Sequence, residues 1–280
     1  MQIINGQLIE DQKAIATGNR GLNYGDAVFE TIRVQQGKIL FWEDHYFRLM
    51  ASMRIMRMEI PMEFTPEALS AQIQELVTSN ELSNKTAVVK LLVYRDSDGL
   101  YTPEQNEIEY IIRLREIDSP FYTLSDGPYE IELYKDHYLS PSLLSTLKTN
   151  NKALQVLGSI YAQENGYQNC LVVNTDKQIV EALNGNLFVV KGDRVKTAPL
   201  SSGCLDGIMR KQVLKLLLEL PDYLIEQAPI SPFELQKADE LFITNVVQGI
   251  QPVTKYRKKE YSNTVAKDLL GKLNARIRLA

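Results

Sequence analysis

Residues 25–33 read Gly25-Asp26-Ala27-Val28-Phe29-Glu30-Thr31-Ile32-Arg33, a glycine turn that leads directly into a strand. In a strand, successive side chains point to opposite faces, so Glu30 and Ile32 share one face while Phe29, Thr31 and Arg33 share the other. An ionic residue on each face is unusual for a core strand, although an edge strand with solvated charges gives the same pattern. The stretch therefore predicts an opening sheet and supplies the first candidate functional residues.

On either side of this strand, the first half of the chain alternates strand and helix patterns. Apolar residues recur every three or four positions in the helical segments, and Thr65-Pro66 supplies an N-cap and a first helical residue. The expected elements are a hairpin of 3–6 with 7–9, a second hairpin of 27–34 with 38–42 turned at 36–37, helices over 44–58 and from 66, and strands over 86–94 and 108–116.

The second half continues the same mixed pattern without a detectable repeat. Ser231-Pro232-Phe233-Glu234 is a capping box that predicts the start of a short helix. The other expected elements are helices over 148–166, 206–220 and 263–278, and strands over 170–174, 178–183, 186–190 and 240–244.

The length of 280 residues predicts two α/β domains, since single cores rarely grow so large. The segment 118–128 contains two prolines, a glycine and small polar residues, and is the best candidate for a linker. We therefore expect an N-terminal α/β domain over 1–117, a linker over 118–128, and a C-terminal α/β domain over 129–280 that carries Lys148.

Composition narrows the class of partner. The 31 basic and 35 acidic residues are interspersed, which argues against a nucleic-acid surface and favours a small-molecule substrate. The two cysteines, Cys170 and Cys204, form no disulfide framework and no zinc spacing, so no metal is expected and a reducing cytoplasm fits. We see no signal peptide and no apolar run long enough for a membrane span.

Four further groups of residues could carry chemistry, and each has an ordinary structural alternative. His45 and Arg48 lie three apart on one helix face, where a histidine often serves as a cap or packing residue. Lys148 follows an apolar stretch in Leu147-Lys148-Thr149-Asn150-Asn151-Lys152, and most lysines are solvated surface charges. A nucleophilic lysine needs a lowered pKa, which burial or a nearby cation such as Lys152 can provide.

The remaining two groups offer backbone N–H groups. Gly207-Ile208-Met209-Arg210 stands at a probable helix N-terminus, where the unpaired N–H groups and the helix dipole favour a phosphate. In Phe242-Ile243-Thr244-Asn245 a strand runs into polar residues and then Gly249. Any helix start binds anions in principle, so these two motifs gain meaning only from their combination with the others.

Taken in order, these groups resemble the class-IV aminotransferase family, the pyridoxal-phosphate enzymes that include branched-chain aminotransferases, D-amino-acid aminotransferases and aminodeoxychorismate lyases. The resemblance begins at Asn19-Arg20-Gly21-Leu22-Asn23-Tyr24-Gly25-Asp26, continues through His45-Tyr46-Phe47-Arg48-Leu49, and ends at Gln251-Pro252-Val253. It implies a two-domain α/β (α+β) fold of fold-type IV, like that of D-amino-acid aminotransferase, with pyridoxal 5'-phosphate as cofactor and a homodimeric assembly.

The resemblance also implies roles for individual residues. Lys148 matches the Schiff-base lysine, Arg48 the arginine that binds the cofactor phosphate, and Glu181 the carboxylate that pairs with the pyridine nitrogen. The phosphate is further expected to accept from the backbone N–H groups of Ile208 and Met209. Asn245 is a further expected cofactor contact, and the expected substrate-binding residues are Tyr24, Arg33 and Arg95.

Within the family, the motifs favour aminodeoxychorismate lyase. Met209 and Asn245 resemble the lyases, and Lys152 stands where aminotransferases usually carry a tyrosine. Against the lyase, Leu100 replaces a second arginine of the loop after Arg95, and Leu183-Asn184 departs from the usual small residues. A branched-chain or D-amino-acid aminotransferase using 2-oxoglutarate is the alternative, and a non-catalytic binding protein on the same fold is a more remote one.

Overall fold

The computed structural model describes residues 1–10, 16–125 and 127–279 and divides them into two compact units. Unit 1 comprises residues 1–121 together with Lys148–Asn151, and unit 2 comprises Tyr122–Leu147 and the chain from Lys152 onward. The change from one unit to the other at residue 121 falls inside the segment 118–128 that composition singled out as a linker.

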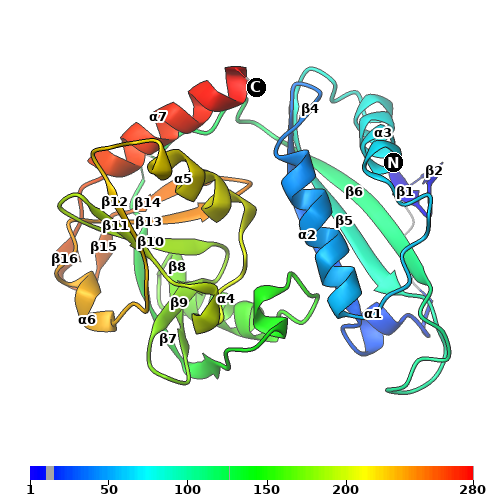
Figure 1. The fold of residues 1–280 in the computed structure, drawn as a ribbon, viewed down its shortest axis with the longest axis horizontal. Coiled ribbons are helices and arrows are strands. Elements are labelled where there is room, and N and C mark those ends of the chain that lie inside the picture. Colours follow the sequence, from blue (N-terminus) through cyan, green and yellow to red (C-terminus); the bar gives the residue numbers. More distant parts are fainter. Residues whose placement is uncertain (11–15, 126, 280) are drawn as a thin grey trace. The chain divides into compact units, whose positions relative to one another are not determined.

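Unit 1 is a six-stranded sheet with two long helices on one face (Figure 1). The strand order is β2-β1-β6-β5-β3-β4, and all neighbouring strands pair antiparallel. Its elements are β1 (Gln2–Ile4), β2 (Gln7–Ile9), α1 (Arg20–Asn23), β3 (Ala27–Gln35), β4 (Lys38–Ile39), α2 (Trp42–Ile55), α3 (Pro66–Ser79), β5 (Thr86–Arg95) and β6 (Ile108–Ile117).

The core of unit 1 lies between the sheet and the helices α2 and α3. Val28 and Ile32 of β3 pack there with Leu49 and Met53 of α2 and Ile73 of α3. Since side chains alternate along β3, the neighbouring residues Phe29 and Thr31 point to the opposite face of the sheet, where they are only half-buried. The face predicted for Glu30 and Ile32 is therefore the face that α2 covers.

The sequence misplaced the boundary between β4 and α2 and also the end of α2, since the helix expected over 44–58 stops at Ile55. The strand expected over 38–42 ends at Ile39, and Trp42 is already the first residue of α2. Phe41 adopts a left-handed conformation (φ 55°) that ends the strand. The carboxylates of Glu43 and Asp44 lie in the first turn of α2, where the positive end of the helix dipole stabilises negative charge. The start of α3 agrees with the prediction, because the Thr65 side chain accepts from Ala68 N at 3.2 Å.

Unit 2 contains two five-stranded sheets. Their orders are β12-β11-β10-β13-β14 and β16-β15-β7-β8-β9. The strands are β7 (Glu130–Leu139), β8 (Asn169–Asn174), β9 (Ile179–Ala182), β10 (Asn186–Lys191), β11 (Arg194–Thr197), β12 (Leu224–Gln227), β13 (Glu240–Asn245), β14 (Gly249–Val253), β15 (Lys255–Tyr256) and β16 (Lys259–Glu260). The helices are α4 (Ala153–Glu164), α5 (Ile208–Leu218), α6 (Pro232–Leu235) and α7 (Thr264–Leu279), with short 3-10 turns at Leu144–Thr146 and Leu200–Ser202.

The two sheets of unit 2 share one apolar core. Leu171 and Ile179 from one sheet meet Leu187 and Ile243 from the other. On the far side of β10 and β13 the rings of Phe188 and Phe242 stack at 5.0 Å between centroids, nearly parallel. The helices α5 and α7 pack on β13 and on each other, so this second sheet is covered on both faces.

The segment around Lys148 departs from the predicted helix over 148–166. The helix α4 begins only at Ala153, and Lys148 to Asn151 run alongside β3 instead. Lys148 O accepts from Phe29 N at 2.9 Å, and Asn150 N donates to Ala27 O at 2.9 Å. These bonds place Lys148 in unit 1, not in the C-terminal domain where the sequence placed it. The capping box at Ser231 is confirmed.

Two further sequence predictions concern the cysteines and membrane-spanning helices. Cys170 and Cys204 are buried and free of disulfides, and burial raises the pKa of each thiol, to about 11 and about 12. Among the described residues, no helix is both long enough and apolar enough to cross a membrane.

Candidate active site

Lys148 is held against the start of β3 by backbone hydrogen bonds on both sides of its neighbour Thr149. The Asn151 amide of the same segment donates to Gly25 O at 3.3 Å. Gly25 has φ +66°, and a Cβ there would overlap the Asn151 side chain, so the turn requires glycine for two reasons. These backbone hydrogen bonds thus fix the position of the Lys148 Cα, from which the side chain extends.

The Lys148 ammonium lies over an aromatic ring. Its Nζ is 4.5 Å from the centroid of Phe29, and Nζ of Lys90 is 4.6 Å from the same centroid. Lys90 pairs with Thr31 in the β3–β5 register, which puts it on the half-buried face of the sheet. Partial burial, and secondarily the nearby Arg113, lower the pKa of Lys90. Two amines therefore share the surroundings of one phenyl ring.

Sequence reasoning overlooked Lys90. The signal was present, because Lys90 is the one charged residue between Ala87 and Tyr94 in an otherwise apolar strand. A single charge in such a strand can equally be a solvated residue on an exposed face, and only the strand register shows that it meets Phe29.

Arg48 belongs to a buried ionic cluster that joins α2 to β3. Its Nε donates to Glu30 Oε1 at 2.8 Å and its Nη2 donates to Glu30 Oε2 at 2.5 Å. His45, fully buried, places Nδ1 at 2.7 Å from Glu30 Oε2. The clues read separately from β3 and from α2 are therefore one cluster. It leaves Glu30 with three donors on two carboxylate oxygens.

Glu30 and His45 differ in protonation state, although they share a hydrogen bond. Burial by itself would raise the pKa of Glu30, but the Arg48 charge and the His45 hydrogen bond outweigh it and lower that pKa to about 2. Burial lowers the pKa of His45, and the charges of Arg48 and Lys148 add to this effect although Glu30 opposes it. Glu30 is therefore ionised and His45 neutral at pH 7.

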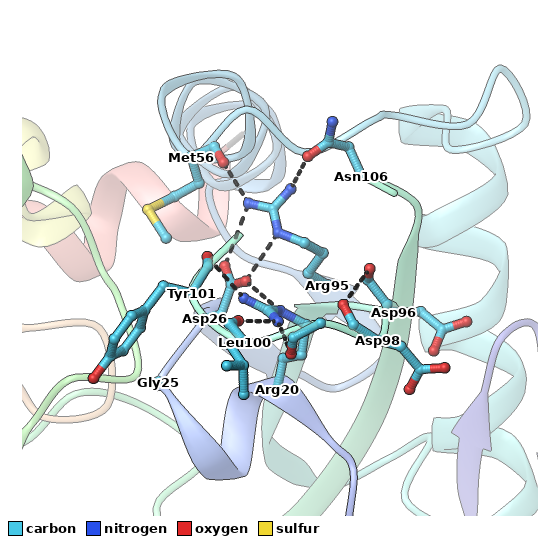
Figure 2. Close-up of polar contacts among 12 residues, drawn as sticks. Arg20, Gly25, Asp26, Met56, Arg95, Asp96, Asp98, Leu100, Tyr101 and Asn106 are labelled. Atoms are coloured by element: carbon cyan, nitrogen blue, oxygen red, sulfur yellow. Dashed lines mark hydrogen bonds and ion pairs between the residues drawn. The ribbon is translucent and has the colours of Figure 1, made fainter. Parts of the chain in front are cut away.

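Arg95, expected to bind substrate, is fully engaged within unit 1 (Figure 2). Its Nε and Nη2 donate to Asp26 at 2.9 and 3.3 Å, and the remaining donors reach backbone carbonyls of Met56 and Arg57 and the Asn106 side chain. All five N–H groups are thus used, which leaves none for a carboxylate while this arrangement lasts. We infer a structural role for Arg95.

A second arginine completes this arrangement. Arg20 Nε donates to Asp26 Oδ2 at 3.0 Å, while its Nη groups donate to the carbonyls of Gly99, Leu100 and Tyr101 (Figure 2). Asp26 therefore lies between two buried guanidinium groups. Together the two arginines anchor the loop between β5 and β6, including Leu100, whose side chain is exposed.

The other two expected substrate residues also lie in unit 1. Arg33 is 2% exposed on β3, and its Nη2 donates to Ser119 O at 2.6 Å. The Tyr24 ring lies 5.8 Å from that of Tyr101, and the Arg20 guanidinium is 4.8 Å from the Tyr24 centroid. Both roles remain predictions.

Unit 2 carries the residues expected at the cofactor ring and phosphate. Glu181, on β9, is 7% exposed and its Oε2 accepts from Leu205 N at 2.8 Å. Ile208 and Met209 form the first turn of α5, whose N-cap is Gly207. Among the described residues no side chain caps this helix, so its first N–H groups are suited to an anion. A Cβ at Gly207 would overlap Asn186 Oδ1.

Asn245 ends β13 and organises the turn that follows. Its Oδ1 accepts from Val247 N at 3.0 Å and from Gln248 N at 2.9 Å, and its Nδ2 donates to Gln248 Oε1 at 2.8 Å. The side chain thus shapes the backbone around the expected cofactor contact, and a direct contact remains a prediction. Lys152 precedes α4 in unit 2, and its expected influence on Lys148 also remains a prediction.

Comparison of the sequence with known proteins shows the family. The sequence matches the class IV amino-transferases over residues 27–256, most of the chain. The protein belongs to the class IV aminotransferase family. Its membership confirms the resemblance that the motifs carried, and pyridoxal 5'-phosphate is the cofactor that follows from it.

Individual relatives differ in their reactions. A Methanocaldococcus jannaschii protein assigned as a branched-chain-amino-acid aminotransferase is 28% identical over 276 residues, covering 98% of this chain and 94% of that protein. The aminodeoxychorismate lyase of Vibrio harveyi is 25% identical over 246 residues, covering 87% and 88%. The crystal structure of the Thermobaculum terrenum branched-chain aminotransferase in its pyridoxal-phosphate form superposes with a TM-score of 0.83 at 22% identity, covering 99% and 92%. The fold is thus that of fold-type IV enzymes, as the sequence resemblance implied.

The residues present fit this cofactor chemically. A phosphorylated pyridine aldehyde needs an amine, an anion site and a partner for its ring nitrogen. Lys148 offers the amine, Arg48 and the first turn of α5 offer cationic and N–H donors, and Glu181 offers a buried carboxylate.

Proposed function

We propose that this class IV family member is a pyridoxal-phosphate-dependent 4-amino-4-deoxychorismate lyase that forms 4-aminobenzoate and pyruvate, as in folate biosynthesis. The observation that carries the choice is Met209 in the first turn of α5. Aminotransferases of the family usually offer a threonine hydroxyl to the phosphate at this position, whereas the lyases often have methionine. Lys152 and Asn245 support the same choice.

Four groups of this chain hold the cofactor in the proposed mechanism. Lys148 Nζ would bind it covalently, Arg48 and the N–H groups of Ile208 and Met209 would bind its phosphate, and Glu181 would keep its ring nitrogen protonated. When bound, the protonated ring stores the electron pair that a substrate carbon releases when it loses a proton. A cofactor held at both its phosphate and its ring nitrogen would lose the freedom to rotate, which is how positioning of this kind speeds a reaction.

Lys148 also moves the proton in the proposed reaction. As a free amine, Lys148 Nζ would accept the proton from the substrate ring carbon that bears the amino group. The electron pair then expels the enolpyruvyl oxygen, and the enolate takes up a proton to become pyruvate. The substrate ring becomes aromatic in the same step, which makes it strongly favourable.

Lys90 replaces Arg95 as our candidate for a substrate carboxylate. Its ammonium lies over the same Phe29 ring as that of Lys148, so a carboxylate near Lys148 would be within its electrostatic reach. Aminodeoxychorismate carries two carboxylates, and Arg33 remains a candidate for one of them. The structural engagement of Arg95 thus removes one cation from the predicted set, and Lys90 supplies another.

The second candidate is a branched-chain or D-amino-acid aminotransferase. The Methanocaldococcus relative favours it, since that similarity covers almost the whole of both chains. The same Lys148, Arg48 and Glu181 would serve, because only the fate of the stored electron pair differs. A non-catalytic role is the least favoured, since all three of these residues are present.

The deciding experiment mixes the purified holoenzyme with aminodeoxychorismate and, separately, with leucine or D-alanine plus 2-oxoglutarate. Pyruvate release, followed by coupled lactate dehydrogenase, is expected from the first mixture and only weak glutamate formation from the second. The reverse result would favour the aminotransferase. A protein without a visible absorbance band from bound cofactor would support the binding-protein alternative. Sedimentation of the same sample tests the predicted homodimer.

A further inference from the structure

Glu30 is an ionised carboxylate that is almost fully buried and has three hydrogen-bond donors around it. Its side chain is 2% exposed, and Arg48 reaches it through both Nε and Nη2. A guanidinium is planar, so two hydrogen bonds along one edge fix its plane and the direction of its other donors. Glu30 therefore determines the orientation of Arg48, a side chain that otherwise rotates about four single bonds.

His45 is the neutral member of this cluster. Because Glu30 is ionised, Nδ1 of His45 must be the donor, and its Nε2 is buried without a hydrogen-bond partner in the described structure. The groups that face the imidazole are Glu30 from β3, Arg48 from its own helix and Lys148 from the neighbouring segment. Two of the three are cations, which disfavours a proton on Nε2. His45 thus contributes one hydrogen bond to Glu30 and no charge.

Neutral His45 has a consequence for an anion at Arg48. A protonated imidazole would compete with Arg48 for the Glu30 carboxylate and weaken the pair that orients the guanidinium. The neutral imidazole instead donates one hydrogen bond to Oε2, and Arg48 remains the cation that pairs with the carboxylate. Glu30, His45 and Arg48 together form what we call the Arg48 clamp.

We propose that Glu30 and His45 are positioning residues that hold Arg48 in the orientation needed to bind the cofactor phosphate. This inference rests on the proposed function, because it takes Arg48 as a phosphate ligand. Glu30 and His45 contact neither the cofactor ring nor the substrate in this role. They act through Arg48 alone, so their loss should affect phosphate recognition selectively.

The test compares two aldehydes on the cofactor-free protein. Dissociation constants are measured by absorbance for pyridoxal 5'-phosphate and for pyridoxal, which lacks the phosphate. Glu30→Gln should raise the constant for the phosphate ester by about tenfold or more, as loss of a charge-assisted hydrogen bond does, with less than about a twofold change for pyridoxal. The ³¹P resonance of the bound ester should shift in the same variant.

Two further variants separate positioning from general loss of structure. His45→Asn keeps an N–H donor for Glu30 and should resemble the wild type, whereas His45→Phe removes it and should weaken binding of the phosphate ester. Glu240→Gln is the matched control, since Glu240 is also a buried carboxylate but accepts from Val265 N and Ala266 N at the start of α7. It should leave the ratio of the two constants unchanged.

Each outcome bears on the inference. Equal weakening of both aldehydes in Glu30→Gln, or no change in either, would overturn it while leaving the proposed function intact. If Glu30→Gln does not fold, the two His45 variants decide, and identical binding ratios for Asn and Phe would overturn it. Wild-type protein that binds neither aldehyde would overturn the proposed function itself, and this inference with it.

Discussion

Acidification should destabilise unit 1 through Glu30. The pKa of this carboxyl is about 2 in the fold, against an ordinary value of 4.5. A lowered carboxyl pKa stabilises the folded state above the unfolded pKa, and that stabilisation is lost as pH falls towards the folded value. The difference corresponds to about 3 kcal/mol, of which roughly 2 kcal/mol should be lost between pH 5 and pH 3.

The assay follows urea unfolding of wild type and Glu30→Gln at pH 5 and at pH 3. Trp42 is the single tryptophan and lies at the start of α2, so its fluorescence reports the unit that contains Glu30. The gap in unfolding free energy between the two proteins should narrow by about 2 kcal/mol at the lower pH. A gap that stays constant would refute the reasoning, because it would mean that Glu30 does not titrate differently in the fold. The gap between the two proteins is compared because His45, whose pKa burial lowers in the fold, also destabilises each of them as pH falls.

The remaining predictions concern other residues of the site. Borohydride reduction should leave a pyridoxyl label on Lys148, detected by peptide mass, and a label on another lysine would refute the assignment. Glu181→Gln should keep the cofactor but slow turnover on the order of a hundredfold, measured at saturating substrate. Lys90→Ala should raise KM for a dicarboxylate about tenfold with little change in kcat, while the exposed Lys85→Ala should change neither. Asp26→Asn should destabilise unit 1 by about 3 kcal/mol in the Trp42 assay, since two buried arginines lose their shared carboxylate.

Local signals in the sequence determined most helix and strand positions. Thr65-Pro66 and the capping box at Ser231 place helix starts correctly because capping depends only on residues within one turn. Alternation along β3 predicted which side chains share a face, and that assignment holds in the structure. The boundary at Trp42 was wrong because a left-handed residue at Phe41 has no strong local signature.

The sequence also determined the family, through motifs that are far apart but retain their order. The order of the motifs identifies the residues that match the family, but it does not show which hydrogen-bond partners each of them has. Arg95 illustrates the limit, since its partner Asp26 lies 69 residues away and accepts two of its N–H groups only because β3 pairs with β5. An arginine committed to structure and an arginine available to a substrate look the same in sequence.

Tertiary structure alone decided how the separate clues combine. The segment after Leu147 is helix-like in sequence, yet its backbone groups pair with β3 about 120 residues earlier, which removes Lys148 from α4. Glu30, His45 and Arg48 are individually ambiguous, and packing α2 on β3 turns them into one ionic cluster. Lys90 meets Phe29 only through strand register. In each case the sequence determines the local conformation and the family, whereas the partners of a charged side chain depend on contacts between distant segments that no local pattern encodes.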